Sequence, residues 1–400
     1  MVALQQRLDD DRAAFRKFYT EMPKIWTTRS ARHAAKNLIE LDQYRRLPFG
    51  WGESDPIAWG KFQKLQASEE ELRQEFISHL DKIAKTAGST GNMSAERLSE
   101  ERKRFESIKV QEKNLYRVRR EWGRQFINDA KSVFDIGAGN QVSDIARSGG
   151  QSADLLRRYV RNPDLEKGHP SDRAVFIGQM AAVAAHFRAG ACSEQSAWVA
   201  TEAYKLMAGT QVTMVADDRV DHMYTVLGPP NFLESAYVDS WPAMPSVANV
   251  ATYGLKNKPE NWTYFQGVAD GRDLRAEGAK WLHPLPKLPS PKPPLSFEQA
   301  TAYLHGRDAK AVYYITSTKE GYNSDSDTEV LPKQGLTLSD DAFTANATNN
   351  FRTKNMSMEQ IASMRSDFHA GPSVTSKYPT RAVGNSKKST EQSRRRITPR

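Results

Sequence analysis

The single cysteine of the chain, Cys192, is the side chain best suited to act as a nucleophile. Apolar residues over 172–187 predict a helix with Ser171 as its N-cap, and this helix ends before Gly190. A second helix is expected from Cys192 to about Met207. Cys192 then sits in the first turn of a helix. There the macrodipole favours a thiolate, and unpaired N–H groups can bind an oxyanion.

A histidine and an aspartate follow on predicted strands. Residues 210–216 and 220–228 predict two strands that carry His222 on the second, and residues 235–239 predict a third that ends at Asp239. In an antiparallel meander, His222 and Asp239 can lie side by side. We expect the helix that begins with Cys192 to pack across this sheet.

Together these three residues predict acyl transfer at an amide or thioester bond. Cys192 would attack a carbonyl carbon. His222 would deprotonate the thiol, or pair with a thiolate, and later protonate the leaving group, while Asp239 orients the imidazole and supports its charged form. This chemistry needs no cofactor, and no spacing of His, Cys and Asp in the chain matches a zinc site.

Two short motifs resemble those of the papain-like/transglutaminase-like superfamily. Asp239-Ser240-Trp241 is similar to the Asn-Ser-Trp of papain-type proteases and to the Asp-x-Trp of transglutaminase-like proteins. The stretch from Gly190 to Glu194 resembles the Gly-Asn-Cys-Gly-Glu of bacterial transglutaminase-like effectors and toxins. The resemblance covers about 75 residues. It implies a small papain-like core and an activity as a protease, glutamine deamidase or transglutaminase on a protein substrate, as in a secreted bacterial effector or toxin.

The chain also departs from the motifs of that superfamily. Ser193 follows Cys192, where papains have Trp and many toxins have Gly. Gln179 is the nearest upstream candidate for an oxyanion glutamine, and Ser193 and Trp241 are further candidates for contact with substrate. The motifs do not choose among proteolysis, deamidation and transamidation.

Two other functions stay open at this stage. Residues 133–140, Val-Phe-Asp-Ile-Gly-Ala-Gly-Asn, resemble the first glycine-rich motif of S-adenosylmethionine-dependent methyltransferases. That fold needs a strand ending in an acid about 20 residues later, whereas residues 152–158 predict a helix. In the second alternative the protein is a non-catalytic scaffold, in which Cys192 is a small buried side chain and the long helices bind a partner.

The sequence predicts an α+β protein with several regions. We expect a helical region over 1–132 that can bind a partner protein, a glycine-containing connector over 133–170 and the catalytic core over 171–280. A Pro-rich linker over 281–295 and a mostly disordered basic tail over 296–400 follow.

Charge and composition constrain partners and location. The net charge is +9, and residues 371–400 hold eight Lys and Arg against Glu391 alone. This tail can contact anionic surfaces, but Tyr378 is its one aromatic residue, which gives no strong nucleic-acid signal. With one cysteine, no disulfide can form within the chain. Neither a secretory signal nor a membrane-spanning stretch is expected. The predicted location is therefore the cytoplasm, or a host cell reached by export without a cleavable signal.

Overall fold

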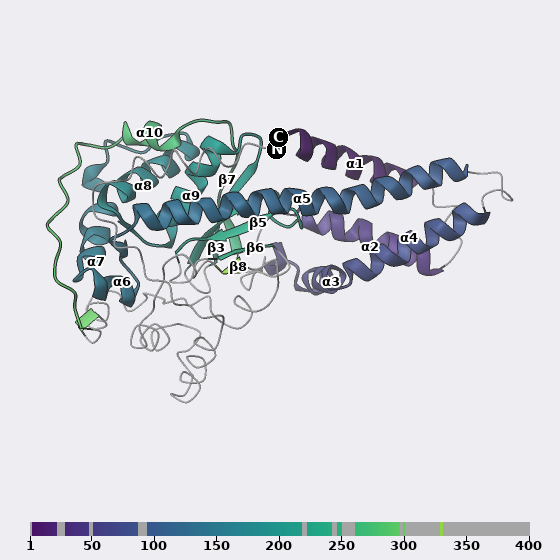
Figure 1. Cartoon of the computed structure of the whole chain (residues 1–400), viewed down its shortest axis with the longest axis horizontal. Coiled ribbons are helices and arrows are strands. Elements are labelled where there is room, and N and C mark those ends of the chain that lie inside the picture. Colours follow the sequence, from purple (N-terminus) through teal and green to yellow (C-terminus); the bar gives the residue numbers. More distant parts are fainter. Residues whose placement is uncertain are drawn as a thin grey trace, which may run out of the picture.

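One long helix joins a helical arm to a core of mixed helices and strands. The computed structural model describes residues 2–21, 29–47, 51–86, 94–217, 222–241, 246–249, 261–296, 299–300 and 329–330. Helix α5 (Ala95–Val133) has 39 residues and spans about 58 Å at 1.5 Å per residue. It runs through the whole arm and continues across the core (Figure 1).

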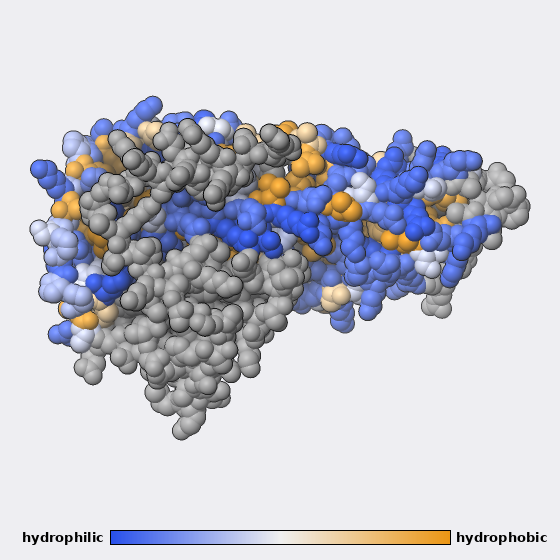
Figure 2. Space-filling model, in the orientation of Figure 1, coloured by the Kyte–Doolittle hydropathy of each residue, from blue (hydrophilic) through white to orange (hydrophobic). Residues whose placement is uncertain are grey.

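The arm is a bundle formed by α5 and four shorter helices: α1 (Val2–Glu21), α2 (Arg29–Arg45), α3 (Pro56–Ala67) and α4 (Glu69–Thr86). A 3-10 turn, η2 (Trp51–Glu53), precedes α3. Apolar residues at helical spacing face inward, so the rings of Phe15, Phe76 and Phe105 lie within 5.4 Å of one another. The outer surface of the arm is largely hydrophilic (Figure 2).

The core contains an antiparallel sheet in the order β7-β3-β4-β5-β6-β8. Its strands are β3 (Gln211–Asp217), β4 (His222–Leu227), β5 (Ala236–Asp239), β6 (Ser246–Ala248), β7 (Asn261–Val268) and β8 (Glu329–Val330). The helices α8 (Arg173–Phe187) and α9 (Cys192–Leu206) pack on this sheet together with the end of α5. The α+β class predicted from the sequence is confirmed.

Side chains alternate between the two faces of the sheet. Met214, Met223 and Val238 point to the helices and share a buried cluster with residues of α5, α8 and α9. Val215, Val226 and Trp241 belong to a separate cluster on the opposite face. Cys192 packs against both clusters, which places it at the border between the helical layer and the far face of the sheet.

The connector between arm and sheet forms short elements. They are β1 (Gly137–Ala138), α6 (Val142–Arg147), α7 (Gln151–Leu155), a π-helical turn η4 (Leu156–Val160) and a 3-10 turn η5 (Pro163–Leu165). β1 pairs in parallel with β2 (Ala189–Gly190), which lies between α8 and α9. This pairing brings the connector alongside Gly190, which lies two residues before Cys192.

The Pro-rich segment lies against the core as an extended strap. It follows α10 (Leu274–Ala279) and passes α8 and α7 before it reaches α6 (Figure 1). The His186 ring contacts the Pro286 carbonyl at 2.8 Å, and the Leu295 N–H donates to the Ala146 carbonyl at 2.9 Å. Leu285 and Leu288 pack beside a buried cluster of the core.

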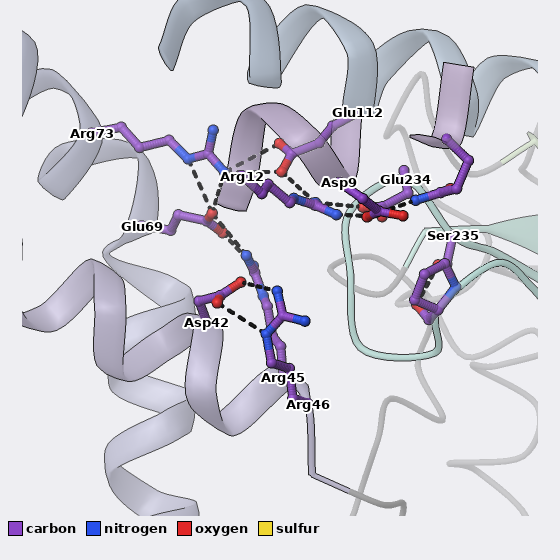
Figure 3. Close-up of polar contacts among 12 residues, drawn as sticks. Asp9, Arg12, Asp42, Arg45, Arg46, Glu69, Arg73, Glu112, Glu234 and Ser235 are labelled. Atoms are coloured by element: carbon purple, nitrogen blue, oxygen red, sulfur yellow. Dashed lines mark hydrogen bonds and ion pairs between the residues drawn. The ribbon is translucent and has the colours of Figure 1, made fainter. Parts of the chain in front are cut away.

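Buried ion pairs connect the arm to the loop between β4 and β5. The guanidinium of Arg12, on α1, donates to both carboxylate oxygens of Glu234 at 2.7 and 2.8 Å and to Glu112 at 2.7 Å (Figure 3). Arg73 continues the chain of charges from Glu112 to Glu69. Because Glu234 belongs to the loop that joins the strands bearing His222 and Asp239, the arm fixes that loop directly.

The tail that we predict to be disordered, over 296–400, lies almost entirely outside the described residues. Within the described helices, none combines the length and apolarity needed to cross a bilayer.

Candidate active site

Cys192 is the first residue of α9 and is partly exposed. Ala191 stands at the N-cap and has no side chain able to cap the helix. Instead, a carboxylate oxygen of Glu194 accepts the Ala191 N–H at 2.7 Å. Arg161 neutralises the buried Glu194, with Nε 3.1 Å from Oε1, and helps to hold the pKa of Glu194 below its usual value against the opposing effect of burial. The turn that carries the thiol is therefore fixed from both sides.

Hydrogen bonds attach α9 to the strand that bears the histidine. The hydroxyl of Ser196 donates to the Met223 carbonyl at 3.0 Å, and the hydroxyl of Thr225 donates to the Ser196 carbonyl at 3.0 Å. All of these groups are buried or nearly so, where a hydrogen bond left unmade would be costly. These contacts fix the start of α9 against the start of β4.

The sheet brings His222 and Asp239 into contact. In the β4–β5 register Thr225 faces Val238, so Asp239 lies diagonally across from His222 on the same face. His222 Nε2 is 2.8 Å from Asp239 Oδ2, and both side chains are fully buried. Asp239 therefore orients the ring and leaves Nδ1 as the nitrogen that can meet a thiol.

The Cys192 thiol lies close enough to the His222 side chain to affect the pKa of the imidazole. Burial by itself lowers the pKa of His222, but the charge and hydrogen bond of Asp239 and the contact with Cys192 outweigh it and raise the pKa to about 10. His222 is thus an imidazolium at neutral pH. The structure brings Cys192, His222 and Asp239 together in one contiguous set.

Trp241 packs against the His222 side of this set of residues. Its ring centroid lies 5.0 Å from that of His222, and only 2% of the residue is exposed. The indole N–H donates to Asn140 Oδ1 at 2.9 Å, and the Trp241 carbonyl accepts from Gln141 Nε2 at 2.5 Å. The predicted site residue Trp241 thus positions neighbouring groups.

The glycine-rich motif of the connector borders the thiol. Gly139 donates its N–H to the Gly190 carbonyl at 3.1 Å. Gly137 has φ +106°, a left-handed conformation that favours glycine, and any Cβ at Gly139 would lie 2.7 Å from the Leu156 side chain. In the part of the chain that the structure describes, the motif's strand pairs in parallel with the two-residue β2 alone and belongs to no larger parallel sheet of the kind that a methyltransferase site requires.

Asn140 directly follows Gly139, whose N–H contacts the Gly190 carbonyl two residues before Cys192, and it accepts the Trp241 indole N–H. Sequence reasoning missed Asn140 and Gln141 as site residues. The one available signal was the pair of amides directly after Gly139, and nothing local connects them with a cysteine about 50 residues later.

The two weaker predictions have different outcomes. The Gln179 amide donates to the carbonyls of Gly168 and Trp281, both at 3.3 Å, so within the described residues it holds the start of the strap and not the thiol. Ser193 does adjoin the nucleophile, and its hydroxyl accepts from Arg161 at 3.3 Å. Among the residues that the structure describes, no cluster of three or more His, Cys, Asp and Glu side chains could hold a metal ion.

The geometry of the site is the main evidence of function, because comparison with known proteins finds no match. No protein-family model matches the chain, and no curated protein or solved structure is significantly similar to it.

Proposed function

We propose that the protein is a thiol acyl-transfer enzyme that cleaves an amide or thioester bond in a protein substrate. The observation that supports it best is the buried His222, which contacts Asp239 on one side and the partly exposed Cys192 on the other. A scaffold role gives no reason for a charged, fully buried imidazole to face the only thiol of the chain.

Acylation begins with a Cys192 thiolate paired with the His222 imidazolium. The sulfur attacks the substrate carbonyl carbon and forms a tetrahedral oxyanion. His222 then gives its proton to the leaving nitrogen or sulfur, and the bond from that atom to the carbonyl carbon breaks. The product is a thioester on Cys192, with neutral His222 still held by Asp239.

Deacylation reverses these roles. His222 removes a proton from a water or an amine, which attacks the thioester carbonyl, and the Cys192 sulfur leaves as a thiolate. Water gives proteolysis or glutamine deamidation, and an amine gives transamidation. All three outcomes share one acyl-enzyme, which is why the site supports the class of reaction more strongly than any single member of it.

The oxyanion needs donors, and Asn140 is our candidate for a side-chain donor. Trp241 occupies Asn140 Oδ1, so the amide group Nδ2 remains able to donate a hydrogen bond. The first-turn N–H groups of α9, which have no acceptor within the helix, would supply the second donor.

This proposal includes a papain-like/transglutaminase-like core, in agreement with the resemblance of the Cys192 and Trp241 motifs. A thiol nucleophile works only while reduced. The enzyme would therefore act in a cytoplasm, either that of the producing cell or that of a host into which it is exported.

The test uses Cys192 itself, because it is the only cysteine. Iodoacetamide labelling, followed by intact mass, reports this one thiol without knowledge of the substrate. At pH 6 the wild type should label at least about tenfold faster than H222Q, because the neighbouring positive charge of His222 stabilises the anionic sulfur that reacts. An H169Q variant, which changes an exposed histidine, is the matched control and should label like the wild type.

Turnover of an activated acyl ester provides the second measurement. The wild type should form a thioester on Cys192 and release it to water, whereas C192A should form none. Coincident labelling profiles for the wild type and H222Q would reject the proposal and favour a structural role for the cysteine.

A further inference from the structure

The carbonyl of Trp241 accepts hydrogen bonds from two side chains outside the core sheet. Gln141 Nε2 lies 2.5 Å from it, and Lys131 Nζ lies 3.3 Å from it. Lys131 belongs to the last turn of α5, whereas Gln141 is the N-cap of α6. The carbonyl lies two residues beyond Asp239, so this pair of donors holds the turn that follows the catalytic carboxylate.

The charged groups around Lys131 come from two elements. Asp144 and Arg147 lie on α6, and Asp239 ends β5. Burial lowers the pKa of Lys131 to about 8, although the two carboxylates oppose this shift. Lys131 is therefore charged at neutral pH and loses its charge within the range in which a cysteine enzyme operates.

We propose that Lys131 is a positioning residue of the candidate active site, which holds the Asp239–Trp241 turn and places a positive charge near the His222–Asp239 pair. This inference rests on the proposed function, because it concerns the same site. The positive charge acts on Asp239, which in turn contacts His222, so it bears on the thiol through that pair. When Lys131 loses its proton, the pair loses this neighbouring charge and the Trp241 carbonyl loses its charged donor.

Lys131 also connects the arm with the candidate active site. It lies on α5, which runs the length of the arm and ends beside the site (Figure 1). A displacement or rotation of the last turn of α5 would move the ammonium away from the Trp241 carbonyl. The position of the Lys131 ammonium near Asp239 thus depends on how α5 packs against the core.

The experiment measures Cys192 alkylation against pH in the full chain. K131M removes the charge, K131R keeps it, and K113M makes the same change at an exposed lysine on the same helix. We expect K131M to move the midpoint of the alkylation curve upward by about half a pH unit, with K131R and K113M close to the wild type at neutral pH. A purely structural role would lower the unfolding midpoint without moving the alkylation curve.

K131R supplies a second readout if K131M does not fold. Arginine stays charged at every accessible pH, so an inflection near pH 8 in the wild-type curve should be absent from the K131R curve. If H222Q slows labelling but K131M and K131R both reproduce the wild-type curve, the Lys131 inference is overturned while the proposed function stands. If H222Q itself has no effect, the proposed function fails first.

Discussion

At the scale of single residues, the central feature is a charged pair with no access to solvent. Moving an imidazolium and a carboxylate out of water costs several kcal/mol per ion, and only close contact offsets it. The 2.8 Å contact between His222 and Asp239 supplies that compensation, and Cys192 adds a third partner. Removing one member leaves the other charge buried and unpaired, so these positions bear on stability as well as on chemistry.

The raised pKa of His222 predicts how stability depends on pH. A histidine with a pKa of about 10 when folded and about 6.5 when unfolded contributes its full stabilisation below pH 6.5 and loses it as pH rises toward 10. The free energy of unfolding of the wild type should therefore exceed that of H222Q most at pH 6. The excess should shrink, by on the order of a few kcal/mol, by pH 9.5.

Urea unfolding at several pH values measures this difference. The H169Q variant is again the control for the loss of a histidine side chain. An excess that stays constant from pH 6 to 9.5 would mean that His222 carries no extra proton in the folded protein.

At the scale of elements, the site depends on where short segments begin. Helix α9 begins at Cys192, and the two-residue pairing of β1 with β2 holds Gly139, next to Asn140, against Gly190, two residues before that start. Such a short parallel ladder has little stability of its own. Its geometry is maintained by the close approach of Gly139 to Leu156 and by the Asp144 carboxylate, which accepts the Ala138 N–H at 2.7 Å.

This arrangement predicts a selective effect of N140A. Loss of an oxyanion donor should slow acylation by an activated ester about 10²- to 10³-fold. The rate of iodoacetamide labelling should stay at the wild-type value, because alkylation at a saturated carbon forms no oxyanion. Equal loss in both rates would instead show that Asn140 only supports the fold of the loop.

At the scale of the whole molecule, the arm and the core share one network of buried charges. Arg12 and Glu112 belong to the arm, and Glu234 belongs to the core loop that links β4 to β5 (Figure 3). Arg119 donates to the Glu234 backbone carbonyl at 2.9 Å, and burial is the main reason that its pKa is lowered to about 10. The two parts are therefore expected to unfold together.

Truncation of Glu234 tests that coupling. E234A removes the carboxylate that contacts both nitrogens of the buried Arg12 and leaves Arg12 with Glu112 alone, so it should lower the free energy of unfolding by about 3 kcal/mol. D42A, which removes a partly exposed partner of Arg46, should cost about 1 kcal/mol or less. Chemical unfolding followed by arm and core probes would show one transition if the parts are coupled, and two transitions if the arm folds independently.

Much of the local structure follows from short-range patterns. Apolar spacing and a glycine break locate α8 and α9 to within a residue or two, although the N-cap of α8 is Asp172, whose carboxylate accepts the Ala174 N–H, and not Ser171. Strand alternation also places His222 on the face that meets Asp239. These features depend on backbone periodicity and capping, which neighbouring residues determine.

Other features are decided only when distant segments pack together. Asn140 and Lys131 precede Cys192 by about 50 and 60 residues, and no local pattern connects them with it. Gln179, the nearest upstream glutamine, faces Gly168 and Trp281 instead of the thiol. The sequence by itself determined the helix that begins with the thiol and the strands that carry its partners. Only the tertiary structure decided which amide and which ammonium surround them, because packing of long-range elements sets those contacts.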